Sequence, residues 1–254
     1  MTDPRVLVTR PAGQADALMD ALRGAQFSVD HQPLLDLQAL PELSADARRC
    51  VLNLDLYQHV IFISTNAVRF GLECIDDYWP QLPVGIAWYA IGDATAALLA
   101  ERGLAVVTPG DAMHSEGLLA RPELAQVAGE KVLIVKGEGG RQTLASALRE
   151  RGATVDELAC YRRTCPQLPA GALAGRLARG PVAAILISSG EGLENLLTLL
   201  SAKETTKFRD IALVVPSPRV AAQAQEAGFR SVITANNASD TAMLQALQQW
   251  RAGD

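Results

Sequence analysis

The sequence predicts an α/β protein made of doubly wound units with parallel sheets. Short apolar runs rich in β-branched residues alternate with helical patterns along the chain. The runs carry few polar residues, as expected of parallel strands that are covered on both faces. The same series of segments also occurs twice. With 254 residues, the chain is long enough for two such units, each with its own core.

The predicted strands are short, and turn residues bound each of them. A strand that is buried on both faces reads as a continuous apolar run rather than as an alternation of apolar and polar residues. The clearest examples are VLVT (6–9), VIFI (60–63), VLIV (132–135) and AILI (184–187).

Helical patterns follow these runs. Leu18, Met19 and Leu22 have the spacing that puts them on one face of a helix. Gly103 and Gly228 each come directly after a helix-like run. A glycine at that position can take a positive φ at little cost and so ends a helix. Strands that alternate with helices in this way predict parallel, doubly wound sheets.

Four pairs of similar segments indicate an ancient tandem duplication. All four pairs keep the same order and an offset of about 125 residues, which unrelated α/β segments would not usually maintain. The second pair sets Ser64 to Asn66 beside Ser188 and Ser189. The pairs are 6–30 with 132–156, 61–73 with 185–197, 89–108 with 213–234, and the segments that begin at 115 and 239.

Composition and charge narrow the function classes. The net charge is −5 and the Lys and Arg residues are dispersed, which speaks against a nucleic-acid partner. No apolar run has the length of a membrane span, and the N-terminus lacks the features of a signal peptide, so we expect a cytoplasmic protein. The cysteines and histidines show no metal-ligand spacing, so we expect no metal. They are Cys50, Cys74, Cys160, Cys165, His31, His59 and His114.

The strand-to-helix turns are the predicted ligand sites, because such sheets bind ligands at the carboxyl ends of their strands. The main turns are rich in small hydroxyl residues, Asn, Asp and Gly, with occasional cations. Each turn by itself can be a plain helix cap. Two related sets of free amides and hydroxyls would suit carboxylates or phosphates. The six turns begin at Thr9, Ser64, Gly92, Lys136, Ser188 and Pro216.

Familiar nucleotide-binding and catalytic motifs are missing from the sequence. KGEGGR (136–141) lacks the spacing of a phosphate loop, and Gln142 stands where the dinucleotide fingerprint needs its third glycine. There is no G-x-S-x-G elbow and no H-E-x-x-H motif. We therefore expect no nucleotide cofactor at this turn.

A set of short motifs in a fixed order resembles the uroporphyrinogen-III synthase family over essentially the whole chain. Each motif is weak alone, but their order and spacing are specific. PSPR (216–219) replaces a more usual G-P-x-x-A turn, which leaves the roles of Ser217 and Arg219 open. The motifs are VTRP (8–11), S-x-N-A-V (64–68), IGDATA (91–96), SEGLL (115–119), KGEGGR (136–141), YRR (161–163) and SDTAMLQAL (239–247).

The resemblance implies two flavodoxin-like domains, each a doubly wound parallel sheet, joined by a two-stranded linker that the chain crosses twice. Mapped onto this sequence, domain one comprises residues 1–35 and 166–254, and domain two comprises 38–160. The linker segments are expected at about 32–38 and 159–166. The family expectation is a monomer.

The resemblance also implies a cofactor-independent hydro-lyase. It would cyclise hydroxymethylbilane, a small polycarboxylate, to uroporphyrinogen III, with ring D inverted through a spirocyclic pyrrolenine in an interdomain cleft. Tyr161 matches the family's proposed proton donor; otherwise it is a tyrosine packed at a domain edge. The implied substrate-binding residues are Arg10, Ser64, Thr65, Asn66, Gly92, Thr95, Lys136, Gly137, Gly139, Ser188, Ser189 and Ser217.

Arg141 and Arg219 are further cations in matched turns. A guanidinium suits a carboxylate well, but each of these side chains can equally be solvated surface charge. Two other readings remain open at the level of sequence. One is a two-lobed, hinge-closing binder of small molecules without enzyme activity. The other is a nucleotide-dependent transferase, which the failed glycine motifs oppose.

Overall fold

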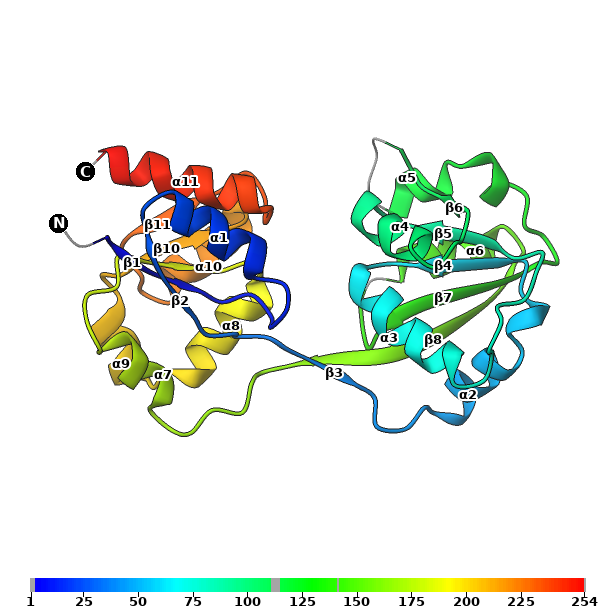
Figure 1. Ribbon diagram of the computed structural model, residues 1–254, viewed down its shortest axis with the longest axis horizontal. Coiled ribbons are helices and arrows are strands. Elements are labelled where there is room, and N and C mark those ends of the chain that lie inside the picture. Colours follow the sequence, from blue (N-terminus) through cyan, green and yellow to red (C-terminus); the bar gives the residue numbers. More distant parts are fainter. Residues whose placement is uncertain (1–2, 111–114, 141, 254) are drawn as a thin grey trace. The chain divides into compact units, whose positions relative to one another are not determined.

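The structure is a computed structural model that describes residues 3–110, 115–140 and 142–253. The chain divides into two compact units. Unit 1 consists of Met1–Asp36 and Thr164–Asp254, and unit 2 of Leu37–Arg163. Each unit has one sheet with helices on both of its faces (Figure 1). An α/β fold with parallel sheets, as predicted from the sequence, is confirmed.

The sheet of unit 1 has five parallel strands in the order β11-β10-β9-β1-β2. The first strand of the chain therefore lies inside the sheet, and the sheet grows in both directions from it, as in doubly wound folds. The strands are β1 (Arg5–Val8), β2 (Ser28–His31), β9 (Ala184–Leu186), β10 (Ala212–Val215) and β11 (Val232–Thr234).

Helices cover both faces of this sheet, which explains why its strands are apolar runs. Val6 and Val8 pack with the helices of one face, and Leu7 packs with those of the other. All three side chains are fully buried, as strand alternation between two covered faces requires. The first face carries α1 (Asp16–Gly24) and α11 (Asp240–Gly253), and the second α7 (Ala172–Leu177), α8 (Gly190–Leu199), α9 (Ala202–Phe208) and α10 (Pro218–Glu226) (Figure 1).

The sheet of unit 2 has the order β3-β8-β7-β4-β5-β6, and the pairs from β8 to β6 are parallel. One face packs against α2 (Ala45–Leu52), η1 (Leu54–Leu56), α3 (Thr65–Asp76) and α4 (Asp93–Ala100). The other packs against α5 (Ser115–Leu119), η2 (Pro122–Leu124) and α6 (Thr143–Glu150). The strands are β3 (Asp36–Ala39), β4 (His59–Phe62), β5 (Ala87–Ala90), β6 (Val106–Val107), β7 (Lys131–Gly137) and β8 (Thr154–Thr164).

The two sheets repeat one arrangement. Strands β8, β7, β4, β5 and β6 of unit 2 occupy the order that β2, β1, β9, β10 and β11 have in unit 1. Val8 of β1 pairs with Leu186, and Ile134 of β7 pairs with Ile61. Val8 and Ile134 correspond in the duplicated segments, so Leu186 is the structural equivalent of Ile61.

This pairing corrects one detail of the sequence comparison. Because Leu186 is equivalent to Ile61, Ser64 corresponds to Ser189. The alignment of the two segments by sequence had paired Ser64 with Ser188 instead. Ser64 and Ser189 are also the N-cap residues of α3 and α8. Because two serines are adjacent, an alignment of the two segments that is wrong by one residue still sets a serine beside Ser64. In a strand, however, a shift of one residue would turn every side chain to the opposite face of the sheet.

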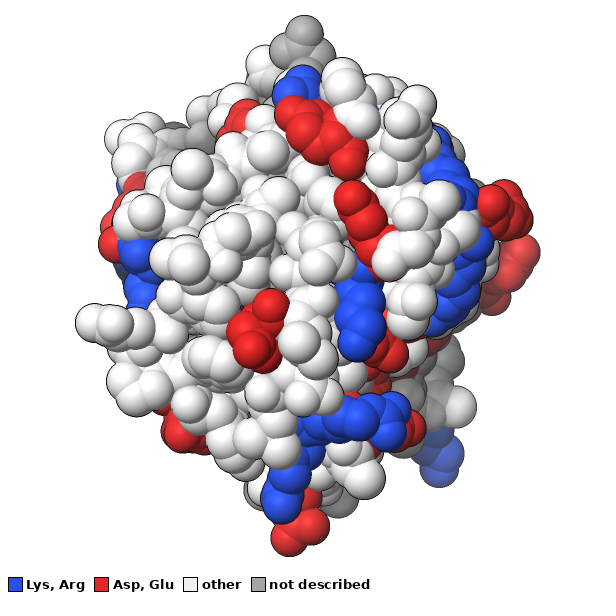
Figure 2. Space-filling view, turned by 90° about the vertical axis from the view of Figure 1, so that its right-hand side faces the viewer, with Lys and Arg blue, Asp and Glu red and all other residues white. Residues whose placement is uncertain are grey.

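One face of the molecule carries charges of both signs (Figure 2). In the face shown in Figure 2, the coloured acidic and basic side chains are interspersed among uncharged residues. This agrees with the dispersal of Lys and Arg in the sequence. Among the described helices, none is both long and apolar enough to cross a membrane.

Candidate functional site

The predicted site residues lie at or just beyond the carboxyl ends of the strands. Because β1, β2, β9, β10 and β11 are parallel, as are β8, β7, β4, β5 and β6, the carboxyl ends of these strands lie at one edge of each sheet. Four of the turns begin a helix with nearly the same backbone geometry. The N-cap residues have φ/ψ of −168°/163° (Ser64), −155°/164° (Gly92), −159°/162° (Ser189) and −164°/157° (Ser217).

The helix-capping role that the sequence allowed is present at the three serines. Each hydroxyl oxygen accepts a hydrogen bond from an amide in the first turn, which satisfies one of the four unpaired donors there. The remaining first-turn amides give each helix a local attraction for an anion. The hydroxyl oxygens of Ser64, Ser189 and Ser217 accept from the amides of Ala67 (3.0 Å), Gly192 (3.0 Å) and Val220 (3.5 Å).

Tyr161 lies beside the first of these caps. Its hydroxyl oxygen is 3.3 Å from the hydroxyl oxygen of Ser64, so the two groups share a hydrogen bond. The ring stacks on Phe70, with centroids 5.2 Å apart and an interplanar angle of 21°. Tyr161 is 6% exposed. Its ring is therefore held by packing while its hydroxyl is directed at the N-terminus of α3.

A β-bulge and a glycine position this tyrosine. Lys136 pairs with Ala159 but Gly137 pairs with Tyr161, which makes Cys160 an extra residue in β8. Cys160 and Tyr161 consequently both pack into the same core, although they are adjacent in a strand. A Cβ on Gly137 would lie 2.7 Å from the nearest ring atom of Tyr161. Only glycine leaves room for the ring at this position.

Lys136 is not in a turn, contrary to the sequence prediction. Strand β7 continues through Lys136 to Gly137, and Lys136 is 5% exposed. Its ammonium nitrogen is 2.7 Å from a carboxylate oxygen of Glu157 on the neighbouring strand. Burial alone would raise the pKa of Glu157, but the hydrogen bond and charge of Lys136 lower it below its usual range. The charge of Lys136 is therefore already balanced within unit 2.

Arg10, the equivalent of Lys136 in unit 1, also has an internal partner. Its guanidinium forms an ion pair with Asp240 at the start of α11 and donates to the carbonyl oxygen of Ala238. Both predicted cations therefore stabilise their own unit. A substrate carboxylate would have to share either cation with an internal acid.

The other predicted residues surround these turns. Thr65 begins α3, Asn66 follows it, Thr95 is buried in α4, and Gly139 has a φ of +71° in the loop after β7. The Ser188 hydroxyl oxygen is buried and has no hydrogen-bond partner in the described part of the chain. Tyr161 connects two of these places, because its hydroxyl contacts Ser64 and its ring lies against Gly137. In unit 1, Arg219 and Gln223 lie beside Gly190 in the turn after β9. Arg141 lies outside the described residues.

Sequence reasoning missed three residues that shape these turns. Phe70 supports the ring of Tyr161, and Glu157 balances Lys136. Gln223, in the second turn of α10, has a buried side-chain oxygen without a hydrogen-bond partner among the described residues. Phe70 lies on α3, the helix that Ser64 caps, so its place in the sequence gave a weak indication that it is close to the site. Nothing in the local sequence marks the other two.

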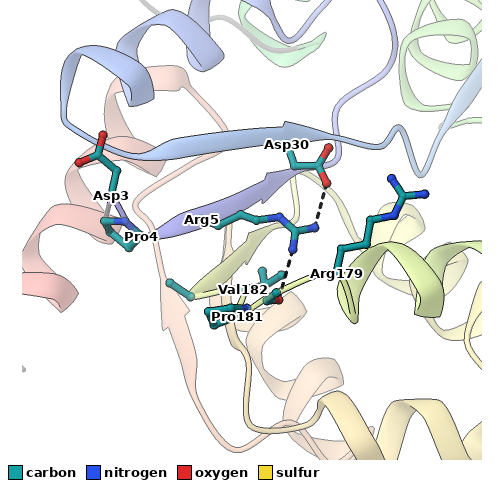
Figure 3. Close-up of a pocket in the computed structure, with 9 residues that line it drawn as sticks. Asp3, Pro4, Arg5, Asp30, Arg179, Pro181 and Val182 are labelled. Carbon is teal, nitrogen blue, oxygen red and sulfur yellow. Dashed lines mark hydrogen bonds and ion pairs between the residues drawn. The ribbon is translucent and has the colours of Figure 1, made fainter. Parts of the chain in front are cut away.

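A pocket of about 590 Å³ lies elsewhere, at the amino-terminal ends of β1 and β9. Arg5 donates to Asp30 (3.0 Å) and to the carbonyl oxygen of Gly180 (3.2 Å), as Figure 3 shows. Arg176 donates to the other carboxylate oxygen of Asp30. The charges of Arg5 and Asp30 are thus balanced internally, and the pocket is at the sheet edge opposite the predicted turns. We do not assign the predicted chemistry to it.

The chain is similar to known proteins in both sequence and fold. The family model of uroporphyrinogen-III synthase HemD matches residues 16–245. The uroporphyrinogen-III synthase of Escherichia coli (strain K12) is 35% identical over 251 residues, which cover 96% of this chain and 99% of that protein. The Salmonella typhimurium (strain LT2) protein of the same name is 35% identical over 246 residues, which cover 96% of this chain and 99% of that protein.

Two solved structures share the fold. The uroporphyrinogen III synthase of the extremely thermophilic bacterium Thermus thermophilus, in a mutant form, has a TM-score of 0.60 and 19% identity, and covers 99% of this chain and 100% of that one. The uroporphyrinogen-III synthetase of Helicobacter pylori 26695 has a TM-score of 0.62 and 14% identity. This match covers 97% of this chain and 99% of that one. The motifs, the paired α/β units and the family match over residues 16–245 together show that the chain belongs to the uroporphyrinogen-III synthase family.

Proposed function

We propose that this protein is a uroporphyrinogen-III synthase that converts hydroxymethylbilane to uroporphyrinogen III without a cofactor. Membership of the family and 35% identity to the Escherichia coli enzyme over nearly the full length support this activity. The reaction class is that of a hydro-lyase, because one water leaves the substrate when the ring closes.

The proposed reaction needs control of conformation more than reactive groups. Loss of the terminal hydroxyl leaves an azafulvene cation. Its carbon bonds to the substituted position of ring D, and the spirocyclic pyrrolenine that forms opens and closes again with ring D inverted. Without control the bilane closes directly to the type I isomer. Orientation of reacting groups can supply about 7 to 11 kcal/mol, which is enough to select one closure over another.

The observation that carries the proposal is the Tyr161 hydroxyl held against Ser64 at the N-terminus of α3. We assign Tyr161 the role of proton donor to the departing hydroxyl. The C–O bond breaks as the proton is transferred, and water leaves. The proton that the closed macrocycle later loses restores the phenol, so the enzyme ends unchanged. Such general acid catalysis typically contributes about 10² to 10⁴ fold in rate.

The proposal also assigns a substrate-binding role to the strand-to-helix turns of both units. Hydroxymethylbilane carries many carboxylates, and the cap turns at Ser64, Gly92, Ser189 and Ser217 share one backbone geometry at a helix N-terminus, which favours anions. We propose that turns from both units bind these carboxylates, with Thr65, Asn66, Thr95, Gly139 and Ser188 beside them. Lys136 and Arg10 each have an internal acid as a partner, so a substrate carboxylate would share either cation with that acid.

The domain plan implied by the family remains part of the proposal. It comprises two flavodoxin-like domains, residues 1–35 with 166–254 and residues 38–160, a two-stranded linker and a monomeric protein. The repeated strand order of the two sheets supports the part of this plan that concerns two similar α/β domains. Closure of the domains around the bilane would keep water from the cation, and opening would release the product.

The test is to supply enzymatically generated hydroxymethylbilane and to separate the type I and type III products. The unmodified protein is expected to give type III, whereas a reaction without protein gives type I. Tyr161→Phe is expected to lower the rate of type III formation by about 100-fold or more. Tyr89→Phe, which removes another buried hydroxyl from unit 2, is the matched control and is expected to keep the rate. Full type III yield and rate from Tyr161→Phe would remove Tyr161 from the mechanism.

A further inference from the structure

We infer that Arg219 and Gln223 form, with the first turn of α8, a subsite in unit 1 that binds one carboxylate of the substrate. The inference rests on the proposed function and adds two things to it. It makes Arg219 the binding cation of unit 1, and it makes Gln223 the residue that positions Arg219.

The absence of a side chain at Gly190 leaves the space for this subsite. Gly190 is the first residue of α8, directly after the N-cap Ser189. A Cβ on Gly190 would lie 3.4 Å from each terminal guanidinium nitrogen of Arg219 and 3.3 Å from the side-chain oxygen of Gln223. Both side chains therefore reach from α10 to the N-terminal turn of α8.

Two buried polar atoms near this turn are unsatisfied. The side-chain oxygen of Gln223 and the hydroxyl oxygen of Ser188 are buried and have no hydrogen-bond partner among the described residues. A buried polar atom without a partner typically costs about 1 to 3 kcal/mol, so such atoms usually mark a missing partner. The Gln223 oxygen lies beside Gly190 together with the guanidinium of Arg219, from which it can accept a hydrogen bond that holds the guanidinium at this turn.

The position of Arg219 also points to an anion. A helix N-terminus carries about half a positive charge, so a guanidinium beside it is repelled unless negative charge lies close to both. Glu191 in the first turn of α8 supplies one such charge. Arg219 itself is exposed and forms no ion pair within the described ranges, so its fork of donors can reach a ligand carboxylate.

The equivalent turn of unit 2 shows that this arrangement is not needed for folding. The caps Gly92 and Ser217 correspond, so Ala94 stands where unit 1 has Arg219, and Leu98 where it has Gln223. Leu98 packs against the apolar core of unit 2. Thr65 takes the place of Gly190. Where unit 2 has an apolar contact, unit 1 thus has a cation and an amide, together with the glycine that makes room for them.

Arg219→Gln tests the binding role. Removal of one charged carboxylate contact is expected to raise KM for hydroxymethylbilane about tenfold or more, with kcat within about twofold. The KM of the unmodified protein should also rise with added salt, and that of the variant should rise less, because the lost contact is the one that salt screens.

Gln223→Glu tests the positioning role and separates it from a structural one. The new carboxylate lies one helical turn after Arg219, where it can form an ion pair with the guanidinium and compete with the substrate. We expect KM to rise about as much as in Arg219→Gln, while the thermal stability is kept or increased. Gln225→Glu adds the same charge on an exposed part of α10 and is the control, with KM unchanged. Gln223→Asn, which keeps the amide but shortens its reach, is expected to give an intermediate KM.

The possible results are distinct. If the unmodified protein forms no type III product, the proposed function fails. If it forms type III but Arg219→Gln and Gln223→Glu leave KM and its salt dependence unchanged in folded protein, the subsite is overturned. A loss of stability in Arg219→Gln with unchanged KM would show that Arg219 only balances Glu191, and this also overturns it. A rise in KM for both variants, without a rise for Gln225→Glu, supports it.

Discussion

The two cap turns at Ser64 and Ser189 have the same backbone but different neighbours. In unit 2, the hydroxyl of Tyr161 lies beside Ser64, and apolar Ala94 and Leu98 occupy the next helix. In unit 1, Arg219 and Gln223 reach the turn that follows Ser189. The same turn therefore lies beside a weak acid in one unit and beside a cation and an amide in the other.

This difference separates two tasks that the proposed reaction requires. A phenol can donate a proton to a departing hydroxyl but adds no fixed charge to hold a carboxylate. A guanidinium holds a carboxylate through parallel hydrogen bonds but does not give up its proton. We therefore expect changes in unit 2 to act mainly on kcat and changes in unit 1 to act mainly on KM.

The largest expected effect is on stability and concerns the ion pairs of the equivalent residues Lys136 and Arg10. The Lys136 side chain is 7% exposed and pairs with Glu157, whereas that of Arg10 is 15% exposed and its partner Asp240 is 35% exposed. Lys136→Met should lower the free energy of unfolding by about 3 kcal/mol, the low end for a broken buried pair, because Arg149 also donates to Glu157. Arg10→Met should cost about 1 kcal/mol. Urea unfolding at neutral pH measures both, and equal losses would contradict the difference in burial.

The next largest effect concerns the space beside Tyr161. Gly137→Ala puts a Cβ within 2.7 Å of the ring and should displace the hydroxyl from Ser64. We expect kcat to fall about 100-fold, as for loss of a general acid, with a smaller change in KM. Gly175→Ala is the control, because a Cβ there meets no atom within 4 Å. That variant should keep its activity, and unchanged kcat in Gly137→Ala would show that the ring adapts.

A smaller effect on kcat is expected to distinguish the two helix caps, Ser64 and Ser189. Ser64→Ala and Ser189→Ala each remove one helix-capping hydrogen bond and should each lower the free energy of unfolding by about 1 kcal/mol. Only Ser64 also contacts Tyr161. We therefore expect kcat to fall in Ser64→Ala and not in Ser189→Ala. Similar kinetics in both variants would mean that the two turns do not differ in function.

The smallest effect at neutral pH is expected for Tyr89, whose equivalent in unit 1 is Val214. Burial first, and then the negative charges of Glu123 and Glu130, raise the pKa of Tyr89 to about 12. A raised pKa favours the neutral phenol in the folded state. This stabilisation is complete below the unfolded pKa of about 10 and is lost as the pH rises through the folded value.

Tyr89→Phe tests this alkaline sensitivity. The variant should lose at most about 1 kcal/mol at pH 7, for one hydrogen bond with His59. Its stability should then decline less than that of the unmodified protein between about pH 10 and 12. Thermal unfolding at several alkaline pH values measures the slopes. Parallel slopes would show that another group, such as buried Tyr57, whose pKa is also raised, controls the alkaline transition.

The sequence by itself determined the fold class, the duplication and the family. These follow from local features, since apolar runs, turn residues and motif order can be read within short segments. It also located the cap turns, because Ser64, Ser189 and Ser217 are the residue type that a helix N-terminus needs. The substrate roles of these residues remain predictions.

Only the tertiary structure decided how these segments meet. Strand pairing, a contact between distant segments, showed that Ser189 rather than Ser188 corresponds to Ser64. A bulge in β8 brought Tyr161 against Gly137, and the continuation of β7 placed Lys136 inside the sheet beside Glu157. The approach of Arg219 and Gln223 to Gly190 likewise joins two helices that no local pattern connects. Register and close packing depend on the partner strand or helix, and a segment read alone does not contain that partner.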